Sequence, residues 1–225
     1  MKKAVVLFSG GLDSSTLVYY AKSKGFQAHC LVFDYGQRHS VEIKKAENLA
    51  GRIKCQATIV KIQLPWQGSS LLDKSKKIPD HLVIDSKKIP STYVPARNII
   101  FLSFAVSWAE VLGAKAVFIG ANALDYSGYP DCRPKFFHAY QQTIRCGLKT
   151  GVQGKLIKIY TPLLKKTKAQ IIKMGMKLKV PYQYTWSCYQ GGLQPCGRCD
   201  SCRLRAKGFI EAGVKDPLIR DVNSR

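Results

Sequence analysis

A short apolar strand, a glycine-rich loop and a helix open this chain, and their order limits what it can fold into. Residues 4–8 are apolar, as in a buried parallel strand, and residues 14–24 carry apolar side chains at helical spacing before Gly25. The intervening loop, Phe-Ser-Gly-Gly-Leu-Asp-Ser-Ser-Thr at residues 8–16, therefore leads into a helix N-terminus. Unpaired backbone N–H groups and the helix dipole favour an anion there, and two glycines allow close approach. These features predict a phosphate-binding loop.

The loop lacks the GxxxxGK[ST] pattern of kinases and GTPases, so cleavage between the β- and γ-phosphates is not expected of it. A tight Gly-Gly turn with a serine N-cap is the plainer alternative. Ser-Gly-Gly-Leu-Asp-Ser resembles the pyrophosphate-binding loop (PP-loop) of the N-type ATP pyrophosphatases, which cleave ATP between its α- and β-phosphates. The predicted ATP-binding residues are Phe8, Ser9, Gly10, Gly11, Leu12, Asp13, Ser14, Ser15, Thr16, Leu17, Val18 and Arg97.

Four further apolar segments follow and alternate with helices or loops. They cover residues 27–33, 56–62, 115–120 and 155–160. Five strands, each followed by a helix or loop, predict an α/β fold with a doubly wound, five-stranded parallel sheet. The resemblance implies the Rossmann-like fold of the adenine nucleotide α-hydrolases. The most apolar helix, 97–112, is expected to be buried on all sides.

The chain changes character near residues 180–182, which suggests a boundary. We expect an ATP-binding domain at 1–180 and a small helical, zinc-binding element at 181–225. Residues 63–92 lose all periodicity, and a lid over the substrate and a solvated excursion are both open interpretations.

The formal net charge of +22 is the strongest compositional signal. Such a field attracts polyanions such as tRNA, and it equally concentrates ATP and small anionic substrates. A surface that is simply rich in lysine is the plain alternative, because the lysines are spread along the chain. No apolar run is long enough to span a bilayer, so we expect no membrane partner. Half of the eight cysteines fall in one fifteen-residue window, which argues against a disulfide framework, and with no export signal we expect a cytoplasmic protein with reduced cysteines.

Polar and aromatic residues follow the second and fourth strands, at the edge where parallel sheets bind ligands. Tyrosines offer faces to a flat heterocycle, aspartates accept from its N–H groups, and arginine binds a carboxylate. Ordinary turn chemistry explains the same composition. Arg97 opens a helix, where a cation is unfavourable unless an anion is also present, although it could equally reach solvent. The predicted substrate-binding residues are Asp34, Tyr35, Gln37, Arg38, Asp125, Tyr126, Tyr129, Asp131 and Arg133.

Four cysteines near the C-terminus, Cys188, Cys196, Cys199 and Cys202, are separated by seven, two and two residues. Such spacing supplies four sulfur ligands to a tetrahedral ion, and zinc is the expected occupant because a closed four-thiolate site needs no redox chemistry. An iron–sulfur cluster is the alternative.

With these segments in view, the chain resembles the 7-cyano-7-deazaguanine synthases of queuosine biosynthesis over nearly its whole length. The segments that carry the resemblance are 8–16, 34–39, 94–98, 125–133, 185–189, 196–208 and 212–213. Two positions depart from the family pattern, Lys135 in place of an acid and Gln170 in place of a commoner glutamate.

The resemblance implies a carbon–nitrogen ligase that uses ATP and ammonia to convert the carboxylate of 7-carboxy-7-deazaguanine to a nitrile, releasing AMP and pyrophosphate. It also implies a cytosolic homodimer with one structural zinc per subunit, and Mg²⁺ with the ATP, for which Asp13 is the expected ligand. Nucleic acid is not required for this reaction. The alternatives are a PP-loop enzyme that modifies tRNA by thiolation or lysidine formation, and a basic, zinc-containing nucleic-acid-binding module.

Overall fold

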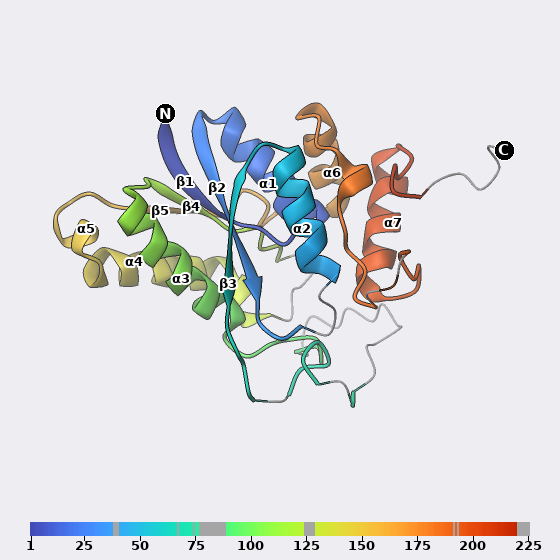
Figure 1. Cartoon of the computed structure of the whole chain (residues 1–225), viewed down its shortest axis with the longest axis horizontal. Helices are drawn as coiled ribbons and strands as arrows, with labels where there is room; N and C mark the ends of the chain where they lie inside the picture. Colours follow the sequence, from blue (N-terminus) through green and yellow to red (C-terminus); the bar gives the residue numbers. More distant parts are fainter. Residues whose placement is uncertain are drawn as a thin grey trace.

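A five-stranded parallel sheet forms the centre of the protein (Figure 1). The computed structural model describes residues 1–37, 41–66, 68–73, 75–76, 89–123, 129–190, 192 and 194–219. The strands are β1 (Lys2–Leu7), β2 (Phe26–Asp34), β3 (Gln56–Lys61), β4 (Ala116–Phe118) and β5 (Lys158–Tyr160). Their order is β3-β2-β1-β4-β5, and every neighbouring pair is parallel. The predicted α/β class and parallel sheet are confirmed.

The strand order reverses after β3. Strands β2 and β3 follow one another on one side of β1, whereas β4 pairs with the other side of β1. Open α/β sheets bind ligands at such a switch point, beside the carboxyl ends of the strands. Phe8, which directly follows β1, donates its backbone N–H to the carbonyl of Leu31 at 2.9 Å. The glycine-rich loop therefore starts at the switch point.

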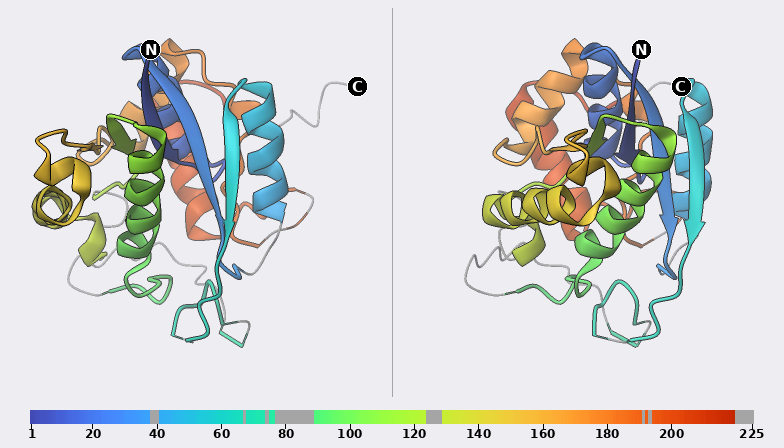
Figure 2. Two further views of the ribbon diagram at one scale, coloured as in Figure 1. Left: turned by 60° about the vertical axis from the view of Figure 1, so that its left-hand side comes forward. Right: turned by 90° about the vertical axis from the view of Figure 1, so that its left-hand side faces the viewer.

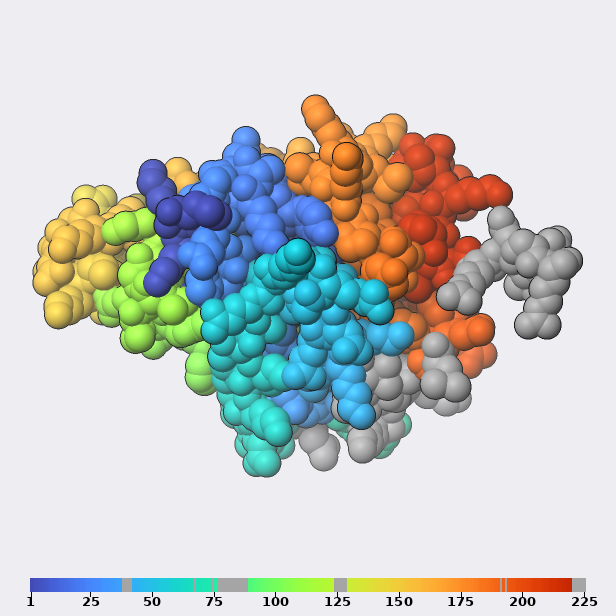
Figure 3. Space-filling model, turned by 45° about the horizontal axis from the view of Figure 1, so that its top comes forward, coloured from blue at the N-terminus to red at the C-terminus, as the bar shows by residue number. Residues whose placement is uncertain are grey.

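Helices cover both faces of the sheet (Figure 2). One face carries α1 (Leu12–Ser23), α2 (Val41–Arg52), α6 (Lys168–Lys177) and α7 (Asp200–Ala212), and the other carries α3 (Arg97–Leu112) and α4 (Pro134–Gly147). Shorter elements are α5 (Lys149–Val152) and the 3-10 turns η1 (Pro130–Cys132) and η2 (Tyr182–Tyr184). Figure 3 shows α6 and α7 at one end of the molecule and α4 and α5 at the other. Among the described residues, no helix is long and apolar enough to cross a membrane.

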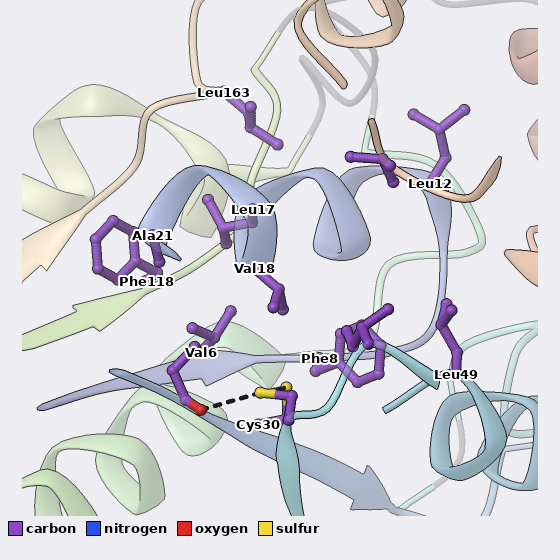
Figure 4. Close-up of a cluster of buried hydrophobic side chains, with 14 of the residues drawn as sticks. Val6, Phe8, Leu12, Leu17, Val18, Ala21, Cys30, Leu49, Phe118 and Leu163 are labelled. Atoms are coloured by element: carbon purple, nitrogen blue, oxygen red, sulfur yellow. Dashed lines mark hydrogen bonds between the residues drawn. The ribbon is translucent and has the colours of Figure 1, made fainter. Parts of the chain in front are cut away.

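The helix that follows the loop is fixed by the core beneath it. Leu17, Val18 and Ala21 of α1 belong to the same fully buried cluster as Val6 and Phe118 of the sheet (Figure 4). Burying one Val or Leu side chain contributes about 1.5–3 kcal/mol. The start of α1 is therefore held in a constant position relative to β1.

Helix α3 is apolar nearly all round, but only one side of it is covered. Leu102 and Ala105 are fully buried, whereas Ile99 is 43% exposed, Phe104 41% and Val111 84%. The expectation that this helix is buried on all sides is wrong, because no described segment covers its outer face. The apolar outer face, Ile99, Phe104 and Val111, is called the α3 face below.

The C-terminal segment packs against α1 and α6. The Tyr182 hydroxyl pairs with Thr16 Oγ1 of α1 at 2.7 Å, and Phe209 of α7 meets the Tyr182 ring edge-on. Arg205 is buried, donates to Asp216 at 2.6 Å and 2.8 Å, and donates to Thr185 Oγ1 at 2.7 Å. Breaking such a buried pair costs several kcal/mol. These contacts tie the C-terminal segment to the helix that begins at the loop.

The contact between α6 and Tyr182 generates a stability prediction. A Cβ added at Gly175 would overlap the Tyr182 hydroxyl, so Gly175→Ala should displace the ring and lower the free energy of unfolding by about 2–3 kcal/mol. A Cβ at Gly51, in α2, would meet open space, so Gly51→Ala should raise it by up to about 1 kcal/mol. Urea denaturation of both variants measures the difference, and equal effects would show that the Tyr182 contact is not formed.

Candidate active site

A cavity of about 290 Å³ opens at the carboxyl ends of β1, β2 and β4. The loop after β1, the turn after β2 and the start of α3 all contribute to its wall. Both predicted binding regions are represented in the lining, by Phe8, Ser9, Asp13, Ser14, Tyr35, Gln37, Arg97 and Tyr129. A second cavity of about 160 Å³ shares Ser9, Asp13, Ser14, Glu42 and Tyr189 with the first. The structure therefore places the glycine-rich loop beside both cavities.

Ser14 holds the loop in its turn. Its hydroxyl accepts from the backbone N–H of Ser9 at 3.2 Å and lies 3.3 Å from the carbonyl of Gly11. The Ser15 hydroxyl donates to the same carbonyl at 2.7 Å, and the Ser15 backbone N–H begins the helical pattern by donating to it at 3.0 Å. The backbone N–H groups of the first helical residues, 12–14, precede that bond and have no acceptor in the helix backbone, so they are suited to an anion.

The predicted ATP-binding residues divide into two sets. Phe8, Ser9, Asp13 and Ser14 line the larger cavity, and Gly11 and Leu12 line the smaller one. Ser15, Thr16, Leu17 and Val18 are fully buried beneath the loop. These four residues therefore support the loop from the core side, and their position favours no direct contact with a ligand.

Gly10 occupies the tightest point of the loop. Its φ is +71°, a left-handed conformation that favours glycine, and an added Cβ would lie 2.8 Å from the Cα of Ala46 in α2. Its carbonyl accepts from the backbone N–H of Trp186 at 2.9 Å. The loop is therefore fixed between α2 and the segment that leads into the cysteine cluster.

Lys168 is a site residue that the sequence reasoning missed. Its Nζ lies 2.8 Å and 2.7 Å from the two carboxylate oxygens of Asp13, and both side chains are mostly buried. Lys168 begins α6, where Thr167 and Gln170 form a reciprocal capping box. The Gln170 amide thus makes the capping contact expected of a glutamate. The sequence did contain one signal for this residue, a lysine at the start of the helix that follows the fifth strand.

Arg97 lies among three phenol groups at the N-terminus of α3. Burial lowers the pKa of its guanidinium, but the electrostatic influence of Tyr35, Tyr129 and Tyr189 outweighs burial and raises it above its usual value. Arg97 therefore stays charged in the cavity at every working pH. The position fits a group that neutralises a phosphate or carboxylate.

Glu42 is a second residue that the sequence reasoning missed. It lies at the start of α2, is only partly exposed and lines both cavities. Burial raises the pKa of its carboxyl group to about 7, while Arg97 opposes the shift and Cys199 adds to it. Glu42 is therefore poised to exchange a proton near neutral pH.

The wall of the larger cavity on the β2 side is aromatic. The rings of Phe33 and Phe101 stack with centroids 4.0 Å apart, and Tyr35 meets Phe101 edge-on. The Gln37 side chain fixes the turn after β2 by accepting from the Tyr35 backbone N–H at 2.9 Å. Asp34 lies outside the lining of the two cavities. The wall suits a flat heterocycle.

The predicted substrate loop is only partly assembled at the cavity. Tyr129 is buried, lines the cavity and pairs with Thr92 through its hydroxyl at 2.6 Å. Asp131 is buried beside it, and its Oδ2 accepts from the backbone N–H of Asn98 at 3.1 Å, which fixes the start of α3. Arg133 is exposed. Of the other predicted residues, Arg38, Asp125 and Tyr126 lie outside the described part of the chain.

The four predicted metal ligands converge. The Sγ atoms of Cys188, Cys196, Cys199 and Cys202 all lie within 4.8 Å of one another. A tetrahedral zinc with bonds of about 2.3 Å requires sulfurs about 3.8 Å apart. Backbone N–H groups of Gln190 and Cys196 approach the Cys188 sulfur, each at 3.3 Å. Three of the four cysteines are buried, so the cluster fits a closed metal site.

Comparisons with known proteins agree with this arrangement. The sequence model of one family, described as Queuosine biosynthesis protein QueC, matches residues 3–213. The 7-cyano-7-deazaguanine synthase of Thermoplasma volcanium is 52% identical over 218 residues, which cover 96% of this chain and 90% of the relative. The enzyme of the same name from Nostoc punctiforme is 50% identical over 225 residues, with coverage of 96% and 99%.

Among solved structures, NMN synthetase from Francisella tularensis aligns with 95% of this chain and 78% of its own, at 16% identity and a TM-score of 0.48. The family assignment does not depend on that likeness. It follows from the family match and from relatives about half identical over almost the full length of both chains. The chain belongs to the family of the queuosine biosynthesis protein QueC, and the relatives named here are carbon–nitrogen ligases called 7-cyano-7-deazaguanine synthase.

Proposed function

We propose that this chain converts 7-carboxy-7-deazaguanine and ammonia to 7-cyano-7-deazaguanine with consumption of ATP. The observation that carries the proposal is that the phosphate-binding loop, the Arg97 guanidinium and an aromatic wall border one cavity. These three features match a triphosphate, a carboxylate that becomes adenylated, and a flat deazapurine. The names of the relatives supply the product, 7-cyano-7-deazaguanine.

Conversion of a carboxylate to a nitrile removes both oxygen atoms, and each is a poor leaving group until it is esterified to phosphate. The carboxylate attacks the α-phosphorus of ATP, pyrophosphate leaves and an acyl-adenylate forms. Ammonia then displaces AMP and gives the amide. A second ATP adenylates the amide oxygen with loss of pyrophosphate and one amide proton, and loss of AMP and the second proton gives the nitrile.

The chain's own work in these steps is positioning and charge neutralisation. The loop N–H groups before Ser15 bind the departing pyrophosphate, and Lys168, which lines the smaller cavity with Gly11 and Leu12, supplies a positive charge beside them. Arg97 neutralises charge at the α-phosphate and the adjoining carboxylate. A divalent cation such as Mg²⁺ would neutralise further triphosphate charge, and Asp13 is the residue that would hold it once Lys168 turns to phosphate.

Ammonia must react as the neutral molecule, so a proton has to leave ammonium near the adenylate. We assign this role to Glu42, which borders both cavities beside the loop and has a carboxyl pKa of about 7. Its ionised form accepts the proton and its raised pKa keeps it a competent base near neutral pH.

The cysteine cluster takes a structural role in this proposal. Zinc is the proposed occupant, one per chain, bound by Cys188, Cys196, Cys199 and Cys202. Zinc would hold all four thiols in place, whereas tRNA thiolation needs cysteines that carry sulfur or ligate a redox cluster. The cluster geometry therefore favours the small-molecule ligase over the thiolase alternative.

We also propose that two copies of the chain associate through the α3 face. Residues 98–109 contain no charged side chain, in a chain whose formal net charge is +22. Two such copies repel each other, so a self-association surface has to be free of lysine and arginine. The exposed Ile99, Phe104 and Val111 provide an apolar surface of this kind.

The direct test is incubation of the purified chain with ATP, Mg²⁺, ammonium and 7-carboxy-7-deazaguanine, with products measured by mass spectrometry. We expect nitrile, and two AMP for each nitrile formed. Formation of AMP only when tRNA is added would refute the proposal and support the tRNA-modifying alternative.

Lys168→Met should weaken the use of ATP. Loss of one charge-assisted phosphate contact should lower kcat/KM for ATP by about 10- to 100-fold, which corresponds to roughly 1.5–3 kcal/mol. Lys173→Met is the matched control, because Lys173 is exposed on the same helix. Steady-state kinetics with varied ATP measure both variants. If Lys168→Met retains wild-type kcat/KM, Lys168 serves only to hold Asp13.

Glu42→Gln should change the pH dependence of both catalysis and stability. The wild-type rate with ammonium should fall as pH drops through about 7, because Glu42 becomes protonated. The variant should be slow at every pH, and its rate should not fall further in this range. The pKa of Glu42 is higher in the folded chain than in the unfolded chain, so folding becomes less favourable as pH rises from the unfolded-state pKa through about 7. Glutamine carries no such penalty, so the variant should have a higher melting temperature than the wild type at pH 8. Glu47→Gln, an exposed position of α2, is the control. If Glu42→Gln has a normal rate and a raised melting temperature, Glu42 affects stability only and is not the base that accepts the proton from ammonium.

Cys199→Ser should lower zinc content and melting temperature together, because metal binding and folding of the segment are linked. The segment also supplies Trp186, whose N–H holds Gly10, so ATP affinity should fall as well. Cys146→Ser, at an exposed free cysteine, should change none of these. Metal analysis and thermal denaturation provide the measurements. Bound iron with a visible absorption band would instead identify a cluster.

Val111→Lys should dissociate the dimer, since it places a charge on an apolar contact surface. Ile210→Lys is the control, because Ile210 is as exposed as Val111 but lies on α7. Sedimentation velocity at micromolar concentration distinguishes the species. An unchanged sedimentation coefficient for Val111→Lys would place the dimer contact elsewhere.

A further inference from the structure

Two cysteines outside the metal cluster face each other inside the core. Cys30 lies on β2 and Cys55 directly precedes β3, and their sulfur atoms are 3.0 Å apart. Cys30 is fully buried and Cys55 is 7% exposed. Figure 4 shows Cys30 in the cluster that contains Val6 and Val18. Neither thiol lines the two cavities of the candidate active site, so the proposed reaction does not use them.

The backbone around the pair favours a bond between the sulfurs. A disulfide holds its sulfur atoms about 2.05 Å apart, so the two thiols need to approach by only about 1 Å. The Cys55 thiol also donates to the carbonyl of Ala28 at 3.0 Å, and its backbone N–H donates to the carbonyl of Ala50 at 2.9 Å. These bonds keep the Cys55 side chain on the β2 side, where Cys30 lies.

The surroundings of the pair make Cys55 the more reactive thiol. A hydrogen bond from Cys30 lowers the pKa of Cys55, burial opposes this, and the positive charge of Lys22 lowers the pKa further. Lys22 is held nearby by donating to the carbonyl of Ile53 at 2.6 Å. A thiolate beside a cation is the form of cysteine that attacks oxidants and disulfides. Cys55 is also the less buried of the two cysteines, at 7% exposed against 0% for Cys30, so it is the one we expect a small oxidant to reach first.

A metal site is the other chemistry that two neighbouring thiols could serve. Closed zinc sites need four ligands. Within the residues that the structure describes, no third His, Cys, Asp or Glu joins Cys30 and Cys55 in a ligand group. The pair therefore has the composition of a dithiol.

We propose that Cys30 and Cys55 are a redox modification site that forms an intramolecular disulfide when the chain meets a small peroxide. The Cys55 thiolate attacks one peroxide oxygen, the O–O bond breaks, and Cys55 becomes a sulfenic acid as the other oxygen leaves as water. The Cys30 sulfur then attacks the Cys55 sulfur, the S–O bond breaks and a second water leaves. In sum, two thiols and one hydrogen peroxide give one disulfide and two waters.

The disulfide would join β2 to the chain that follows α2. The two cysteines are 25 positions apart, and linking them restricts the unfolded chain far more than the folded one. The oxidised protein should melt about 5–10 °C above the reduced protein. The sheet geometry near the active site should be retained, because both sulfurs already lie in contact.

The test treats the full-length, metal-loaded chain with one equivalent of hydrogen peroxide and then removes the peroxide with catalase. Free thiols are alkylated in denaturant, and the chain is digested with trypsin without a reductant. Cleavage after Lys24, Arg38, Lys54 and Lys61 leaves Cys30 and Cys55 in separate peptides, 25–38 and 55–61. The expected product is one species with the summed mass of both peptides less two hydrogens, which separates after reduction.

Three variants complete the experiment. Cys146→Ser removes the exposed thiol and should leave the linked peptide unchanged. Cys55→Ser and Cys30→Ser should each abolish the linked peptide and the increase in melting temperature on oxidation. The proposal is overturned if the wild-type chain consumes the peroxide while both peptides are recovered alkylated, with the oxidation at Cys146 or at the metal-binding cysteines.

Discussion

The site depends on how one turn of backbone is held at Gly10. Its left-handed conformation and its contact with Ala46 leave no room for a side chain. The hydrogen bond from Trp186 fixes the same residue from the other side. Because α1 is anchored in the core beneath, the loop N–H groups have one position relative to the sheet. A phosphate site made of backbone N–H groups is only as well ordered as the segments that hold that backbone.

The same contact explains why a cysteine cluster belongs to an ATP-dependent enzyme. The cluster lies beyond the cavity, but its leading segment carries Trp186 and Tyr182, which contact the loop and the first helix. A metal that orders this segment also orders the phosphate site, without taking part in the chemistry. The buried Arg205, paired with Asp216, also donates to Thr185 and to the carbonyl of Tyr182 and so holds the same segment.

The charged side chains of the site have close neighbours before any ligand arrives. Asp13 is paired with Lys168, and Arg97 is surrounded by phenol oxygens. Glu42 holds its proton up to about pH 7 because it is partly buried. Buried charges are stable only when compensated, so an arriving triphosphate has to exchange partners with these groups. In the proposed reaction, this exchange would free Asp13 from Lys168, so that its carboxylate could hold a divalent cation.

The sequence by itself determined the features that neighbouring residues create. These are the glycine-rich loop between a strand and a helix, the five parallel strands and the four cysteines, because each depends on spacing within a few residues. Only the tertiary structure decided that Lys168 meets Asp13, 155 positions away, and that Glu42 faces the cavity. It also decided that Asp131 fixes a helix start and that one side of α3 is exposed. Periodicity predicts that a helix has an apolar or polar side, but which side meets a neighbour depends on how helices pack across the sheet.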